Sequence, residues 1–271
     1  MSTLDLAAIA ADITDISHRA GKAILDVYEQ DFSVVQKEDN SPLTQADLAS
    51  HVIIRDALAA LTPDIPLLSE ESASIDFTTR STWRQYWLVD PLDGTKEFVN
   101  RNGEFTVNIA LIRDHVPVFG VVYVPVSGVS YTGIEKEGAT RQDPGQKPVR
   151  IYIRQPCADP MVIVGSRSHA NPKLLRHLAA LGEYQLISMG SSLKFCLLAE
   201  GKADFYPRLG PTSEWDTAAA HAVVSAAGGQ IITLDGKPLR YNCKESLLNP
   251  EFLVIADSSR DWLGPFQDYQ S

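Results

Sequence analysis

The chain is poor in cysteine and has no excess of basic residues. Its three cysteines, Cys157, Cys196 and Cys243, are widely spaced and form no Cys-x-x-Cys pair. Because three thiols cannot all pair within one chain, a reducing cytoplasm is the expected location. Lys and Arg number 24 against 34 Asp and Glu, which gives a net charge of −10. Nucleic-acid-binding surfaces are usually basic, so no nucleic-acid partner is expected. An anionic small substrate remains compatible, because bound cations can reverse the local field.

Long hydrophobic runs and several common enzyme motifs are also missing. The most apolar stretch, 116–126, contains Pro117, Gly120 and Pro125, and it is shorter than the ~20 residues of a membrane span. The first residues lack the basic start of a signal peptide, so no transmembrane segment is expected. The chain has no Gly-x-x-x-x-Gly-Lys, Gly-x-Gly-x-x-Gly, His-Glu-x-x-His or Gly-x-Ser-x-Gly sequence. This argues against the commonest nucleotide-binding, zinc-peptidase and serine-hydrolase classes.

The first half of the chain predicts two helices and then a series of strands. Apolar residues at spacings of three and four predict helices over about 6–27 and 44–61. Strand-like segments are 33–36, 65–69, 86–89, 105–112, 116–124 and 129–134. The last three are rich in β-branched residues and joined by short turns with Gly or Pro, which is typical of an antiparallel meander.

The second half has a different pattern. After a polar stretch at 136–147, strands and helices alternate as in an α/β layer. The expected strands are 161–165, 184–187, 203–206 and 230–233, and the expected helices are 172–181, 192–200 and 214–227. A chain of 271 residues can form one large domain or two of ordinary size. We therefore predict an α/β protein in which an α+β half, 1–155, precedes an α/β half, 156–271.

The segment after residue 86 carries the clearest chemical signal. A short apolar run ends in Asp90, and Asp93 follows three residues later. Pro91 disfavours a helical conformation at Asp90, so Asp90 is expected at the exit of a strand. Gly94 permits a tight turn, and Thr95 can cap a short helix. Two carboxylates on a bent backbone beside free amide groups can hold Mg²⁺ and an anion together. The segment therefore predicts a metal-dependent phosphate site.

Three further acids have a structural explanation as well as a functional one. Glu70 follows the apolar run 65–68, so it either enters solvent or joins the acids above at a second strand end. Asp47 and Asp216 lie in Thr-x-x-Asp and Ser-x-x-Asp helix starts, where a carboxylate can accept a hydrogen bond from a backbone N–H. An acid in a first helical turn can also face a cation. Capping and metal binding therefore both stay open for Asp47 and Asp216.

Three motifs resemble those of the lithium-sensitive, Mg²⁺-dependent inositol monophosphatase superfamily. They are Ser69-Glu-Glu71, Asp90-Pro-Leu-Asp-Gly-Thr95 and Glu214-Trp-Asp-Thr-Ala-Ala219, in the family's order and spread over nearly the whole chain. Within the superfamily the chain looks most like the bacterial 3′(2′),5′-bisphosphate nucleotidases, because of the segments 94–98, 166–170, 190–195 and 206–212. The resemblance implies a layered αβαβα sandwich with the active site between the two halves.

The resemblance also implies a metal site and a catalytic group. The metal-binding residues would be Glu70, Asp90, Leu92 through its carbonyl, Asp93 and Asp216. They would hold two Mg²⁺ ions, and Glu70 with Asp47 would help to position a third ion and the attacking water. Thr95 would orient that water, with Asp47 behind it as the base. The backbone N–H groups of Gly94 and Thr95 would hold the scissile phosphate.

The implied substrate is adenosine 3′,5′-bisphosphate, a by-product of sulfate assimilation, which would be hydrolysed to AMP and phosphate. The residues that would bind it are Gly94, Thr95, His169, Ser192, Lys194, Arg208 and Asp216. Lys194 and Arg208 could donate charge-assisted hydrogen bonds to the second phosphate. Alternatively, Ser191 or Ser192 merely caps a helix and Arg208 is surface charge. Which of the two serines contacts substrate stays open.

Two rival functions remain at this point. An inositol-phosphate or sugar-phosphate monophosphatase would use the same metal residues with another substrate pocket. A non-catalytic, phosphatase-like sensor is disfavoured, because every metal-binding residue named above is present. Related proteins are sometimes attached to the cytoplasmic face of the inner membrane, and they occur as monomers or homodimers, but the sequence decides neither point.

Overall fold

The structure is a computed structural model that describes residues 4–29, 34–36, 42–72, 74–166 and 172–266. Seven α-helices are assigned within these ranges: α1 (Leu6–Tyr28), α2 (Gln45–Leu61), α3 (Phe77–Arg80), α4 (Thr95–Val99), α5 (Pro172–Ala179), α6 (Leu193–Ala199) and α7 (Glu214–Ala226). Two 3₁₀ turns, η1 (Glu70–Ser72) and η2 (Gly264–Phe266), complete the helical elements of the described residues. The two long helices predicted near the N-terminus are confirmed. Within those ranges, no helix combines the length and the apolar character needed to cross a membrane.

The larger sheet has seven strands in the order in which they follow one another along the chain. They are β3 (Leu67–Ser69), β4 (Gln85–Asp93), β5 (Thr106–Arg113), β6 (Val116–Val124), β7 (Val129–Ile134), β8 (Gly138–Gln142) and β9 (Val149–Ile151). β3 runs parallel to β4, and every other neighbouring pair is antiparallel. The predicted meander is confirmed. β8 lies within the polar stretch 136–147, for which no strand was predicted.

The smaller sheet has five strands in the order β11, β10, β12, β14, β13. Their bounds are β10 (Met161–Ser166), β11 (Tyr184–Met189), β12 (Phe205–Arg208), β13 (Gln230–Thr233) and β14 (Phe252–Ile255). The two pairings of β10 are parallel, and the two pairings of β14 are antiparallel. A separate two-stranded ribbon consists of β1 (Val34–Gln36) and β2 (Pro42–Thr44).

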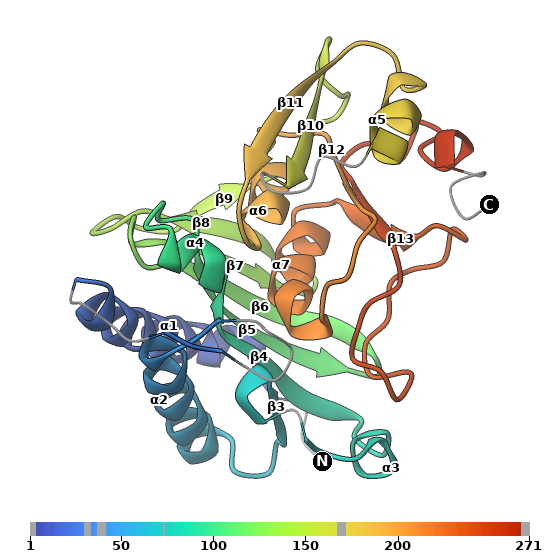
Figure 1. Cartoon of the computed structure of the whole chain (residues 1–271). Helices are drawn as coiled ribbons and strands as arrows, with labels where there is room; N and C mark the ends of the chain where they lie inside the picture. Colours follow the sequence, from blue (N-terminus) through green and yellow to red (C-terminus); the bar gives the residue numbers. More distant parts are fainter. Residues whose placement is uncertain (1–3, 30–33, 37–41, 73, 167–171, 267–271) are drawn as a thin grey trace.

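The helices and the two sheets alternate in five layers (Figure 1). α1 and α2 cover one face of the larger sheet, and α6 and α7 lie between its other face and the smaller sheet. α5 and the 3₁₀ turn η2 cover the outer face of the smaller sheet. The predicted αβαβα sandwich of the α/β class is therefore confirmed.

Strand periodicity explains why the larger sheet can be covered on both faces. Successive side chains of a strand point to opposite faces, so a strand buried on both sides is apolar at nearly every position. On β5, Ile109 and Leu111 belong to the core against α1, whereas Ala110 and Ile112 belong to the core against α7. The central strands therefore read as continuous apolar runs rather than as alternating ones.

Two glycines let α7 lie directly on the larger sheet. A Cβ added to Gly120 on β6 would lie 2.3 Å from the carbonyl oxygen of Ala219, and one added to Gly133 on β7 would lie 2.5 Å from the Cα of Val223. Any larger residue would push α7 away, because these atoms belong to the helix backbone. The first turn of α7 is thereby held at the edge of the sheet where β4 ends.

The positions of the strands can be compared with the predicted division of the chain into two halves. The larger sheet ends at Ile151, and the smaller one begins at Met161. α7 comes from the second half of the sequence but packs on the sheet of the first half. The division into 1–155 and 156–271 stays a prediction.

Candidate active site

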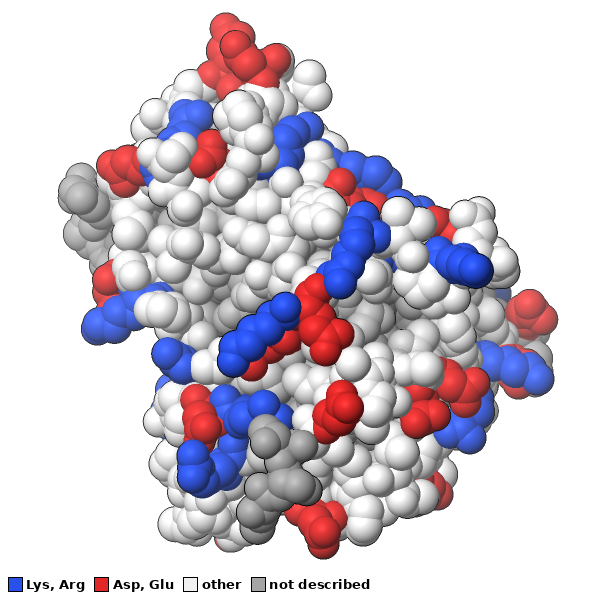
Figure 2. Space-filling model, turned by 180° about the vertical axis from the view of Figure 1, so that it is seen from behind, with Lys and Arg blue, Asp and Glu red and all other residues white. Residues whose placement is uncertain are grey.

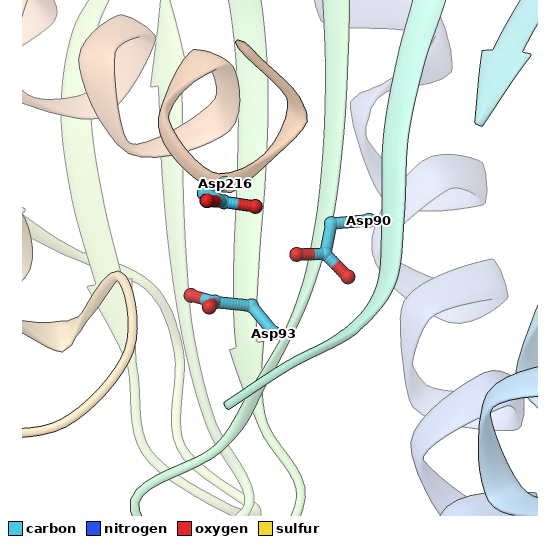
Figure 3. Close-up of side chains that lie close together, drawn as sticks. All are labelled: Asp90, Asp93 and Asp216. Carbon is cyan, nitrogen blue, oxygen red and sulfur yellow. The ribbon is translucent and has the colours of Figure 1, made fainter. Parts of the chain in front are cut away.

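Three carboxylates from two distant segments meet where β4 ends and α7 begins. Asp90 and Asp93 on β4 and Asp216 on α7 each offer a carboxylate oxygen, and these oxygens lie within 4.8 Å of one another. Figure 3 shows the three side chains pointing toward one another. Metal ions in proteins are commonly held by such converging carboxylates.

An irregularity in β4 explains why Asp90 and Asp93 share one side of the sheet. Residues three apart in a regular strand point to opposite faces. Here Asp90 pairs with Asn108 and Asp93 pairs with Thr106, so three steps on β4 match two steps on β5. This extra residue turns Asp93 back to the side of Asp90. β4 therefore continues beyond Asp90, where a strand end was predicted.

The electrostatic surroundings of Asp90 bring in two more acids. Asp90 is 1% exposed, and burial raises the pKa of its carboxyl well above the ordinary value. The charges of Glu70, Asp93, Asp216 and Asp47 raise this pKa further. Glu70 is the first residue of the turn η1, and Asp47 is buried in the first turn of α2. The five acids singled out in the sequence therefore lie close enough for the other four to affect Asp90.

Each carboxylate of the trio is fixed through one of its two oxygens. The backbone N–H of Leu92 donates to Asp90 Oδ1 at 3.1 Å, and that of Ser192 donates to Asp93 Oδ2 at 2.6 Å. Asp216 Oδ2 accepts from the Thr212 hydroxyl at 2.7 Å and from the Ser213 N–H at 2.8 Å. No described residue donates a hydrogen bond to the other oxygen of these three acids. Three hard oxygen donors, held in place and turned toward a common centre, suit Mg²⁺.

Asp216 makes the predicted helix-start contact and also lies in the carboxylate trio. Its bond with Ser213 N–H is the helix-start contact predicted for the Ser-x-x-Asp sequence, and the same side chain belongs to the carboxylate trio. Burial, followed by the charge of Asp93, raises the pKa of Asp216 to about 7. For Asp47, which is buried in the first turn of α2, capping and metal binding both stay open.

The turn predicted to hold the phosphate follows directly after Asp93. Gly94 has a φ of 94°, which favours glycine. It caps α4, whose first residue is Thr95. The expectation that Thr95 itself caps this helix was wrong, because the left-handed turn at Gly94 already reverses the chain. The first N–H groups of a helix have no partner within the helix, and those of α4 lie beside the carboxylate trio.

A cavity of about 160 Å³ opens beside the trio. It is lined by Asp93, Gly94, Lys96, Glu97, Ser191, Ser192, Lys194, Phe195, Tyr206, Arg208, Thr212, Asp216 and Thr217. Two predicted metal-binding acids and three predicted substrate-binding side chains, Ser192, Lys194 and Arg208, thus share one cavity. On the face of the molecule opposite to the view of Figure 1, basic side chains lie among acidic ones and form no continuous basic stripe (Figure 2).

The two cations predicted to bind a second phosphate both line this cavity and both contact backbone carbonyls. Lys194 is 7% exposed, and its ammonium donates to the carbonyl of Ser191 at 2.6 Å. Burial lowers the pKa of Lys194 to about 8. Arg208 donates from Nη2 to the carbonyl of Pro211 at 2.6 Å.

Comparison of the whole sequence with known protein families shows to which family the chain belongs. Residues 5–262 match the inositol monophosphatase family. The chain belongs to this family. The resemblance read from the three motifs is thereby confirmed, and members of the family are metal-dependent phosphatases.

The relatives within the inositol monophosphatase family carry a narrower name. The 3′(2′),5′-bisphosphate nucleotidase CysQ of Escherichia coli is 52% identical over 244 residues, which cover 89% of this chain and 97% of the relative. The CysQ of Salmonella typhimurium is 51% identical with the same coverage. The crystal structure of CysQ from Bacteroides thetaiotaomicron is 44% identical, with a TM-score of 0.80, and covers 91% of this chain and 97% of that one.

The remaining predicted residues differ in how far the structure describes them. His169 lies outside the described residues. Leu92 is buried beside Asp90. Ser192 is 2% exposed, and its hydroxyl lies 2.8 Å from Asp93 Oδ2. The roles assigned to all of these residues stay predictions.

Sequence reasoning missed the polar residues that support the carboxylates. Thr106 and Asn108 are fully buried on β5, and Thr212, which donates to Asp216, precedes α7. A signal was present for the first two. They stand two residues apart at the start of an otherwise apolar strand, so they share one face, and buried polar side chains need partners.

Proposed function

We propose that this chain is a Mg²⁺-dependent 3′(2′),5′-bisphosphate nucleotidase that hydrolyses adenosine 3′,5′-bisphosphate to AMP and phosphate. The observation that carries the proposal is one cavity that is lined both by the acids Asp93 and Asp216 and by the cations Lys194 and Arg208. A substrate with two phosphates needs both kinds of partner. The CysQ relatives, at 52% and 44% identity, carry this activity in their names.

The metal ligands in this proposal are those of the carboxylate cluster. Glu70, Asp90 and the carbonyl of Leu92 would hold one Mg²⁺, and Asp90, Asp93 and Asp216 would hold a second. Glu70 and Asp47 would help to position a third, looser ion. When bound, Mg²⁺ lowers the pKa of water and neutralises charge that develops on the phosphate. Inhibition by Li⁺ is part of the proposal.

The side chains around the metals would carry out the proton transfer and orientation. Phosphate-monoester hydrolysis is among the slowest uncatalysed reactions, so the site must lower its barrier by ~20 kcal/mol or more. The hydroxyl of Thr95 would orient the attacking water, and the carboxylate of Asp47 would accept its proton. The N–H groups of Gly94 and Thr95 would hold the scissile phosphate at the start of α4.

The second phosphate and the nucleoside would be bound by residues of the second half. Lys194 and Arg208 would donate charge-assisted hydrogen bonds, and Ser192 and His169 would complete the set. The alternative function is an inositol-phosphate or sugar-phosphate monophosphatase, which would have no use for these two cations. The substrate is a small molecule in both cases.

The test is Mg²⁺-dependent phosphate release from adenosine 3′,5′-bisphosphate and from inositol 1-phosphate, compared as kcat/KM. Strong preference for the nucleotide, with AMP as product, is expected. Lys194→Ala should raise KM for the bisphosphate much more than for inositol phosphate, whereas the exposed Lys202→Ala should alter neither. Preference for inositol phosphate would overturn the substrate proposal and leave the metal site intact.

Location and assembly stay proposals. Cys157, Cys196 and Cys243 are all free thiols, as a reducing cytoplasm would keep them. Attachment to the inner membrane, which the resemblance also implied, has no support among the described residues. A monomer and a homodimer are both compatible with the proposed chemistry.

A further inference from the structure

Ser192 lies between the two metal-binding segments that come from different halves of the chain. Its hydroxyl oxygen is 2.8 Å from Asp93 Oδ2 and 2.6 Å from the backbone carbonyl oxygen of Asp216. A hydroxyl has a single hydrogen, so it can donate to only one of these acceptors at a time. In either orientation it lies between the carboxylate on β4 and the first turn of α7.

Asn108 restricts what this hydroxyl can do. Its side-chain amide donates to the Ser192 hydroxyl oxygen at 2.9 Å, and Asn108 is fully buried on β5. Because the hydroxyl accepts this bond, its own hydrogen must point away from Asn108, toward Asp93 or the start of α7. Asn108 also lies 3.4 Å from Asp93 Oδ2. Buried polar side chains with such complete bonding are rigid.

The loop that presents Ser192 is held in an uncommon conformation. Ser191 has a φ of 48°, in the left-handed region that residues other than glycine seldom adopt. The Lys194 ammonium binds the Ser191 carbonyl, and the Thr106 hydroxyl lies 3.0 Å from the Ser191 hydroxyl. This turn directs the N–H of Ser192 into Asp93.

We propose that Asn108 and Ser192 form a neutral bracket that fixes the Asp93 carboxylate against the first turn of α7. The bracket thereby sets the affinity for the Mg²⁺ held by Asp93 and Asp216. Both are positioning residues, since they act through Asp93. With Oδ2 of Asp93 fixed by the bracket, the carboxylate keeps its orientation toward Asp90 and Asp216. This inference rests on the metal site of the proposed function.

The bracket predicts a specific pattern of Mg²⁺ affinities. Partners that orient metal ligands typically change metal affinity by 10–100-fold when removed, so Ser192→Ala and Asn108→Ala should each weaken Mg²⁺ binding about tenfold. The double variant should lose less affinity than the product of the two single losses, because both side chains support the same oxygen of Asp93 and contact each other. Ser192→Thr keeps the hydroxyl and should restore affinity.

The experiment is calorimetric titration of the chelator-treated protein with MgCl₂ in the absence of substrate. The matched control is Ser130→Ala, which removes another buried hydroxyl of the larger sheet. This hydroxyl lies 2.7 Å from His18 Nε2 on α1. The Mg²⁺ affinity of Ser130→Ala should equal that of the unmodified protein. If Asn108→Ala does not fold, Asn108→Ser takes its place in the same comparison.

The outcomes separate this inference from the function on which it rests. Unchanged affinity in Ser192→Ala, or losses in the double variant that equal the product of the two single losses, would overturn the bracket. Absence of Mg²⁺ binding by the unmodified protein would overturn the metal site itself, and with it the proposed function. Mg²⁺ binding with wild-type affinity in the variants would leave the proposed function standing.

Discussion

Replacing Asp93 with asparagine is expected to have opposite effects on stability with and without Mg²⁺. The carboxylate oxygens of Asp90, Asp93 and Asp216 lie within 4.8 Å of one another, so their charges repel when no cation lies between them. Asparagine removes one charge while its side-chain oxygen can still accept the bond from Ser192 N–H. In a chelator, Asp93→Asn should therefore be more stable than the unmodified protein.

The size of the effect follows from the geometry. Two full charges at this separation repel by ~3 kcal/mol at an effective dielectric constant of about 20. Burial and, after it, the same repulsion raise the pKa of Asp90, so proton uptake relieves part of the repulsion. A net gain of ~1–2 kcal/mol remains, which corresponds to a melting temperature higher by roughly 2–8 °C. With Mg²⁺ at about 100 times its Kd, the unmodified protein gains ~2.7 kcal/mol by mass action, and the variant loses most of this gain.

Differential scanning calorimetry in EDTA and in saturating MgCl₂ measures both effects. The control is Asp64→Asn, which removes an exposed charge remote from the cluster and should leave the Mg²⁺ response unchanged. The clustered-carboxylate reasoning is refuted if Asp93→Asn melts below the unmodified protein in EDTA. It is equally refuted if Mg²⁺ does not move the transition of the unmodified protein.

Three further outcomes are expected. Burial lowers the pKa of Lys194 to about 8, so its ammonium loses its charge above that pH. In a pH–rate profile, kcat/KM for the bisphosphate should therefore fall above pH 8. Lys194→Arg should shift this fall to higher pH. Burial also lowers the pKa of His221 to about 3, so only the unfolded chain takes up its proton near pH 6.5, and stability is lost as pH falls from 6.5 toward 3. Between pH 7 and 5 this loss is about 2 kcal/mol, and urea unfolding of His221→Asn should lack it. Gly120→Ala places a methyl group against the carbonyl of Ala219 and should cost roughly 1–3 kcal/mol by the same assay.

Periodicity predicted the elements that are long or strongly patterned. The helix α1 and the strands β6 and β7 have almost the bounds expected from the spacing of their apolar residues. β8 was missed because its sequence, Gly138–Gln142, is polar and half exposed. β14 was missed because four apolar residues, Phe252–Ile255, are too few to define a period. Its place in the sheet depends on pairing with β12 and β13, which no local pattern records.

The acids of the site were predictable, and their support was not. Asp90, Asp93 and Asp216 stand out by motif and by resemblance, because the sequence indicates a strand end or a helix start at each of them. The contact between Asn108 and Ser192 joins residues 84 positions apart in the chain. Only the folded arrangement brings β5 and the loop before α6 together, so the sequence alone could indicate no more than a buried polar residue in need of a partner.

The close fit of α7 on the glycines of β6 and β7 has a consequence during synthesis. The strands β6 and β7 have been made once Ile134 is added, but the helix that covers them begins only at Glu214, a delay of roughly 4–16 s at about 5–20 residues per second. During that interval Val122, Val124 and Tyr131 of these strands have no α7 to pack against. The nascent chain should therefore depend on chaperones until the ribosome has released the Ala-rich helix.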